Sequence, residues 1–124
     1  MKSVKSILVT SLVILALFPG VLNAQDSFER KKIEFLISLV ENLKEAIFIR
    51  NGTEYDGKQA AEHLRRKLQI AGGKIQTADD FIRLCASKSL ISDKPYLIRS
   101  SEGKTINAEQ YFYQKLKEYT LMTK

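Results

Sequence analysis

Residues 48–55 have the sequence Phe-Ile-Arg-Asn-Gly-Thr-Glu-Tyr, in which aromatic and β-branched residues flank an Asn-Gly dipeptide. Asn51 and Gly52 favour a type I′ turn, because both central positions of that turn need a positive φ angle. We therefore expect a short β-hairpin here. The hairpin also carries two polar side chains beside its turn, those of Arg50 and Tyr55.

A long amphipathic helix is predicted before this hairpin. Its apolar stripe, with spacings of three and four residues, consists of Ile33, Leu36, Val40, Leu43 and Ile47. Phe28 and Phe35 widen the apolar face, so burial within a domain is favoured over a two-stranded coiled coil. A capping box of Asp26 and Glu29 is expected at its start.

Three further helices and a second hairpin are expected after residue 55. The candidate N-terminal caps are Asp56 with Gln59, Thr77 with Asp80, and Asn107 with Gln110. Residues 95–99 and 105–106 have extended character and flank a turn signal at residues 101–104. The sequence therefore predicts an α+β fold that is mainly α, with about four helices and one or two short β-hairpins. In this fold the first helix packs against the second and the last.

Residues 1–24 have the pattern of a secretory signal peptide. Lys2 and Lys5 precede an apolar run over residues 7–18, and Pro19-Gly20 breaks the helix before Ala24. A run of about twelve residues is shorter than the roughly 20 that span a bilayer, so we expect cleavage after Ala24. The alternative is a retained membrane anchor. Removal of residues 1–24 from a chain of 124 leaves 100, enough for one compact core over residues 25–124.

Composition narrows the classes of partner. The formal charge of +6 falls to +4 without Lys2 and Lys5, and the remaining basic residues are interspersed with acids. We expect no nucleic-acid partner outside the cell, and no stable membrane insertion once the signal peptide is removed. Cys85 is the only cysteine, so no internal disulfide can form, and its helical spacing from Phe81 predicts a buried thiol. An intermolecular disulfide is the alternative.

Polar residues that could form a site gather around the first hairpin and the helix after it. An arginine, a phenol and an imidazole, from Arg50, Tyr55 and His63, could converge on one anionic or carbonyl group. The full set of candidate binding residues is Arg50, Asn51, Tyr55, His63, Lys67 and Tyr96. The structural alternative is that these side chains fix the hairpin and the edge of the helix. With one histidine and one cysteine the chain has no recognised metal-ligand spacing, so we predict no metal site and no cofactor.

Several segments together resemble one bacterial family of short exported proteins of unknown function. They are residues 48–52, Tyr55, 60–65, 67–68, 77–82, 86–89, 94–98 and 103–104. This chain has Ala46 where members often have a cysteine, and Asp93-Lys94 where they often have Ser-Gly. The resemblance implies a bacterial protein that is periplasmic or secreted after removal of residues 1–24. It implies no activity, because the family has none assigned.

We therefore predict a non-enzymatic periplasmic domain that binds an envelope protein or an anionic ligand. One alternative is a small envelope hydrolase or transferase in which His63 is the general base, with Ser87 or Tyr96 as the candidate nucleophile. Another alternative is a structural homodimer formed through the first helix. No residue is assigned as catalytic.

Overall fold

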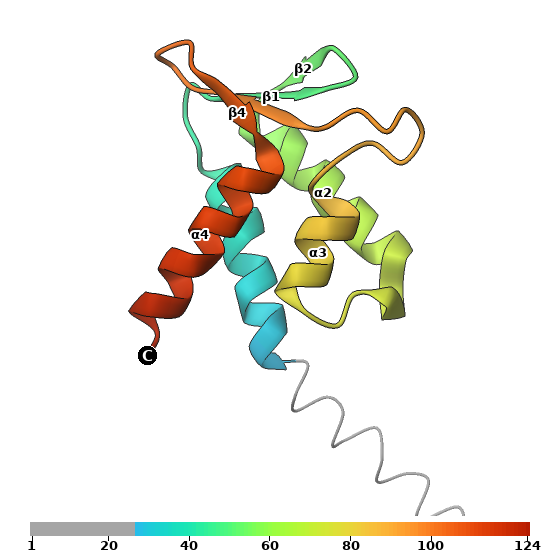
Figure 1. The fold of residues 1–124 in the computed structure, drawn as a ribbon, viewed down its shortest axis with the longest axis vertical. Helices are drawn as coiled ribbons and strands as arrows, with labels where there is room; N and C mark the ends of the chain where they lie inside the picture. The colour runs from blue at the N-terminus through green and yellow to red at the C-terminus, as the bar shows by residue number, and fades with distance from the viewer. Residues whose placement is uncertain (1–26) are drawn as a thin grey trace, which may run out of the picture.

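Four helices and two β-hairpins make up residues 27–124, the part of the chain that this computed structural model describes (Figure 1). The first helix covers residues 27–41 and is called the N-terminal helix. The remaining elements are β1 (Ile47–Arg50), β2 (Thr53–Tyr55), α2 (Gly57–Ala71), the single 3-10 turn η1 (Gly72–Lys74), α3 (Ala78–Cys85), β3 (Leu97–Arg99), β4 (Thr105–Asn107) and α4 (Ala108–Met122). The predicted α+β, mainly α fold is confirmed. The predicted signal peptide and the Asp26 cap lie outside the described residues.

The two hairpins join into one antiparallel sheet with the strand order β2-β1-β3-β4. Both hairpins were predicted, but their union through β1 and β3 was not. A cross-strand row runs through the sheet, because Phe48 lies opposite both Tyr55 and Ile98, and Ile98 lies opposite Ile106. Phe48 and Ile98 are 8% and 5% exposed, so this row forms the buried face, which lies over one end of the helices (Figure 1).

Most of the turns and helix caps predicted from short sequence patterns are present in the structure. Asn51 and Gly52 have φ angles of 52° and 78°, as the type I′ prediction requires. The capping boxes of α2 and α3 are both present. The predicted cap of α4 is wrong in one respect: α4 begins after Asn107, but the Asn107 side chain makes no capping hydrogen bond. Asn107 is also the last residue of β4, paired with Leu97, and the strand sets the direction of its side chain.

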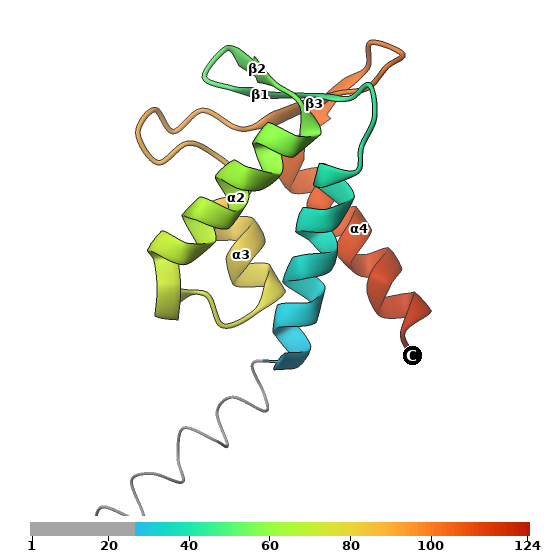
Figure 2. The same ribbon diagram turned by 180° about the vertical axis from the view of Figure 1, so that it is seen from behind.

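The N-terminal helix lies between α2 and α4 (Figure 2). Its buried stripe consists of Ile33, Leu36, Ile37 and Val40, each at most 5% exposed. Its Phe35 ring packs against Tyr119 of α4 at a centroid distance of 4.4 Å, and Glu41 pairs with Arg65 of α2 at 3.1 Å. The predicted packing against the second and last helices is therefore confirmed.

This helix ends earlier than its apolar periodicity predicts. Ile47, the last residue of the predicted stripe, belongs to β1 and pairs with Arg99 of β3. Residues 42–46 form the connection, in which Glu45 has a φ angle of 63°. An apolar residue at helical spacing also suits a strand, and here pairing in the sheet determines its conformation.

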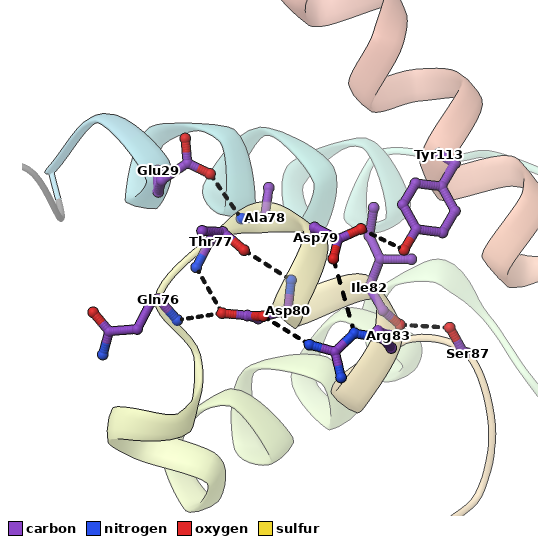
Figure 3. A network of polar contacts seen from close by, with 10 residues as sticks. All are labelled: Glu29, Gln76, Thr77, Ala78, Asp79, Asp80, Ile82, Arg83, Ser87 and Tyr113. Atoms are coloured by element: carbon purple, nitrogen blue, oxygen red, sulfur yellow. Dashed lines mark hydrogen bonds and ion pairs between the residues drawn. The ribbon is translucent and has the colours of Figure 1, made fainter.

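Helix α3 is tied to the N-terminal helix at its start and to α4 along its side (Figure 3). The backbone N–H of Ala78 donates to a carboxylate oxygen of Glu29 at 2.9 Å. The Tyr113 hydroxyl of α4 donates to Asp79 at 2.7 Å. This hydrogen bond, together with burial, raises the pKa of Tyr113 to about 12. The short α3 is thus held by polar contacts to two longer helices, in addition to its buried apolar face.

Gly57, the first residue of α2, lies against the backbone at the end of the N-terminal helix and in the connection that follows it. A Cβ atom at this position would overlap the carbonyl oxygen of Val40 and lie 3.1 Å from that of Leu43. Only a residue without a side chain allows α2 to begin here. The close approach also sets where α2 runs beneath the first hairpin.

We expect Gly57→Ala to lower the free energy of unfolding by about 1–3 kcal/mol, because the added methyl group forces two backbones apart. Urea denaturation followed by circular dichroism measures this change. Gly73→Ala is the matched control, because a Cβ at Gly73 meets no atom within 4 Å. Equal stability of the two variants would contradict the close approach at Gly57.

Candidate functional site

A half-open cavity of about 320 Å³ lies between the buried face of the sheet, α2 and the start of α4. Its apolar walls come from Phe48, Ile49, Ala60, Leu64, Leu97, Ala108 and Phe112. Its polar lining comes from Arg50, Tyr55, Gln59, Glu62, His63, Arg66 and Tyr96. The volume lies at the lower end of the range for small-molecule sites, about 300–1,000 Å³.

Strand and helix periodicity bring these polar residues to one place. Arg50 is two residues after Phe48 in β1, so both side chains point toward the helices. Tyr96 is two residues before Ile98 and points to the same side, although it lies 46 positions from Arg50 in the sequence. On α2, Arg66 follows His63 by three residues, so these two side chains share one face of the helix.

Four of the predicted binding residues form a continuous chain of hydrogen bonds. Arg50 Nη1 donates to His63 Nδ1 at 3.3 Å, and His63 Nε2 lies 3.4 Å from the Tyr96 hydroxyl. Lys67 Nζ donates to the same hydroxyl at 3.0 Å. We call this set, Arg50, His63, Tyr96 and Lys67, the polar chain.

The direction of each hydrogen bond in the polar chain follows from the donors at its two ends. A guanidinium can only donate, so His63 Nδ1 accepts, and the neutral ring carries its proton on Nε2. Nε2–H then donates to Tyr96, whose oxygen also accepts from Lys67. The hydroxyl hydrogen of Tyr96 has no acceptor among residues 27–124 and remains available as a donor.

The environment keeps the His63 imidazole neutral. Burial, and then the positive charges of Arg50, Lys67 and Arg66, lower the pKa of His63 from 6.5 to about 4. A protonated ring would place an Nδ1–H against the N–H of Arg50 and break the first hydrogen bond of the polar chain.

The backbone of Tyr96 is fixed on both sides. Its N–H donates to the carbonyl of Ser87 at 2.9 Å, and its carbonyl accepts from the N–H of Ala108 at 2.8 Å. Lys67 is also held, because its ammonium group donates to the carbonyl of Lys88 at 3.2 Å. The hydroxyl of Tyr96 is therefore oriented before any ligand arrives.

Asn51, a predicted binding residue, and Ser87, a candidate nucleophile, do not line the cavity. Asn51 is exposed at the hairpin tip, where its side chain hydrogen-bonds Ser89 and Ser92 and does not line the cavity. Ser87 is 5% exposed, and its hydroxyl donates a hydrogen bond to the carbonyl of Ile82 at 2.6 Å.

The Cys85 thiol is buried and free, as predicted, and burial raises its pKa.

Arg66, Gln59 and Glu62 were not among the predicted binding residues, although all three line the cavity. The sequence does contain a signal for two of them. Gln59 and Arg66 lie four residues before and three residues after His63, on the same helical face. That signal could be used only once His63 itself was known to face the cavity. Tyr55 also lines the cavity, close to Arg50 across the first hairpin.

Within residues 27–124, no group of three or more His, Cys, Asp or Glu side chains is placed to hold a metal ion. In the same range, none of the helices has both the length and the apolar character needed to cross a membrane.

The structure is a small α+β domain with a cavity lined by apolar and polar side chains, and the chain belongs to a known family. The family of unknown function DUF5329 matches residues 27–120, which is most of the chain. The uncharacterized protein YfeK of Salmonella typhimurium is 33% identical over 92 residues, covering 74% of this chain and 76% of the relative. No solved structure matches the chain. The predicted membership of a bacterial family without an assigned function is thus confirmed.

We expect the imidazole of His63 to titrate near pH 4 and not near 6.5. At pH 5 the unfolded chain then binds a proton that the folded protein does not, so the free energy of unfolding falls as the pH is lowered from 7 toward 4. For one proton the slope is at most about 1.4 kcal/mol per pH unit. The protein has one histidine, so NMR of the ring in an untagged sample measures its titration directly.

Arg50→Gln should raise the midpoint of this titration, because it removes a charge that disfavours the imidazolium. Arg30→Gln is the control, because Arg30 is an exposed arginine on the N-terminal helix that does not line the cavity. A wild-type midpoint near 6.5, or the same midpoint in the wild type and Arg50→Gln, would contradict the proposed arrangement of the polar chain.

Proposed function

We propose that this protein is an exported, non-enzymatic domain that binds a small anionic ligand in the cavity beside Arg50 and Tyr96. One observation carries the proposal. The Tyr96 hydroxyl accepts hydrogen bonds from both His63 and Lys67, so its own hydrogen is left to donate into a cavity lined by two guanidinium groups. An anion supplies the acceptor that residues 27–124 do not provide.

The electrostatics of the cavity support an anion over a neutral ligand. Two arginines, Arg50 and Arg66, line the cavity, and Glu62 is the one carboxylate among the lining residues. The positive charges act in a partly enclosed space, where they are screened less than on an open surface. After burial, the charges of Arg50, Lys67 and Arg66 contribute to the lowered pKa of His63.

The geometry favours binding over catalysis. His63 lies within reach of Tyr96, as the hydrolase or transferase alternative requires, but the two ring nitrogens are both engaged. Nδ1 accepts from Arg50, and Nε2 carries the proton that faces Tyr96, so no lone pair is free to take a proton from a nucleophile. Ser87, the other candidate nucleophile, is buried away from the cavity, with its hydroxyl bound to Ile82.

The homodimer alternative receives less support. The apolar stripe of the N-terminal helix is buried within the domain, with Leu36, Ile37 and Val40 at 0% exposure. A dimer built on that stripe would have to open the domain core. Export to the bacterial periplasm is part of the proposal and rests on the signal-like pattern of residues 1–24.

Thermal unfolding in the presence of different anions tests this function. Acetate, hexanoate, benzoate, sulfate and inorganic phosphate are compared with chloride at equal ionic strength. A bound anion stabilises by about 1.4 kcal/mol at ten times its dissociation constant, which is several degrees for a domain of about 100 residues. We expect at least one of these anions to raise the melting temperature of the wild type by this amount.

The same anion should have little effect on Arg50→Gln, because a hydrogen bond to a charged group is worth about 1.5–3 kcal/mol. Arg30→Gln should respond as the wild type does. If no anion in the set stabilises the wild type, or if Arg50→Gln is stabilised equally, the cavity is not an anion site.

A further inference from the structure

We infer that the ligand of this cavity is a small monocarboxylic acid with an apolar body. The inference rests on the proposed function of the cavity as an anion site and adds the chemical class of the anion. It follows from three properties of the lining: its apolar walls, its net charge and the kind of hydrogen-bond donors it offers.

Half of the residues that line the cavity are apolar. Among them Phe48, Leu64 and Phe112 belong to three different elements, β1, α2 and α4, and to the buried core. An inorganic anion has no apolar atoms to contact these side chains, whereas an aliphatic or aromatic body does.

The charge of the lining fits one negative charge on the ligand. Arg50 and Arg66 contribute two positive charges and Glu62 one negative charge, while His63 is neutral. Lys67 does not line the cavity, but its ammonium group lies beside it, where it donates to the hydroxyl of the lining residue Tyr96 and to the carbonyl of Lys88. The lining residues themselves therefore carry a net charge of +1, which a monoanion balances, and a dianion would bring a second negative charge into the cavity that Glu62 lines.

The donors are side chains and not backbone amides. Phosphate sites are often built from the free N–H groups at a helix start. Here Ala108, at the start of α4, lines the cavity, but its N–H already donates to the carbonyl of Tyr96. The donors are instead the O–H of Tyr96 and the guanidinium groups, whose planar pairs of N–H bonds match a carboxylate as well as a phosphate, so the choice of a carboxylate rests on the net charge and the apolar lining.

The single histidine provides the test. Its ring resonances are followed by NMR at pH 7, where the imidazole is neutral, while hexanoate, hexanamide, acetate or inorganic phosphate is added to the full untagged protein. We expect hexanoate to shift the His63 signals saturably. Hexanamide, which has the same body without the charge, should bind at least about tenfold more weakly.

Acetate should bind about a hundredfold more weakly than hexanoate, because it lacks four methylene groups that the apolar walls would cover. Inorganic phosphate should also bind at least about tenfold more weakly. Arg50→Gln should reduce hexanoate affinity about tenfold or more, whereas Arg30→Gln should leave it unchanged. The melting temperature and ring spectrum of Arg50→Gln without ligand establish that this variant is folded.

The possible results separate this inference from the proposed function. If phosphate binds more tightly than hexanoate, the carboxylic acid class is wrong while the anion site stands. If hexanamide binds as tightly as hexanoate, the charge contributes nothing, and both the inference and the proposed anion site are wrong. If no anion shifts the His63 signals or raises the melting temperature, both the inference and the proposed function fall. Equal affinity of acetate and hexanoate would exclude the apolar body.

Discussion

The antiparallel pairing of β1 with β3 is the interaction on which the rest of the structure depends. It joins two hairpins, neither of which has a face of its own large enough to cover the ends of the helices, and it places Phe48 opposite Ile98 at the centre of the buried face. It also fixes the register of Arg50 relative to Tyr96. A shift of one residue in this pairing would place Arg50 and Tyr96 on opposite faces of the sheet, because directly paired residues share a face and successive residues of a strand face opposite sides. The pairing of β1 with β3 therefore determines both the fold and the shape of the cavity.

His63 shows how the helical layer and the sheet are coupled electrostatically. A neutral imidazole is the one state of this ring that can accept from Arg50 and donate to Tyr96 at the same time. The cost of burying the charged form and the nearby cations favours that state, as the lowered pKa of the ring indicates. The ring therefore acts as a fixed spacer that holds a guanidinium on one side and a phenol on the other. This pre-organisation means that a ligand need not order those side chains itself.

The parts of the fold that local chemistry controls could be predicted from the sequence, and those that depend on distant pairing could not. The Asn51-Gly52 turn and the caps at Asp56 and Thr77 are set by neighbours within four residues. The end of the N-terminal helix was placed too late, because Ile47 fits the helical stripe but pairs in the sheet. In the site, Arg50, Tyr55 and His63 were linked by their closeness along the chain. The direction of each hydrogen bond, and the separation of Asn51 from the cavity, depend on how β1, α2 and residues 89–92 meet in space.

The outer strands of the sheet, β2 and β4, affect whether the protein aggregates at high concentration. A sheet with four strands has two open edges, and an open edge can pair with another chain and start aggregation. Here β2 and β4 are only three residues long. The middle residue of β2 is Glu54, whose carboxylate pairs with Arg99 at 2.9 Å. An approaching strand would find few free backbone groups and a charged pair beside them, so the edges themselves discourage growth of the sheet from one molecule to the next.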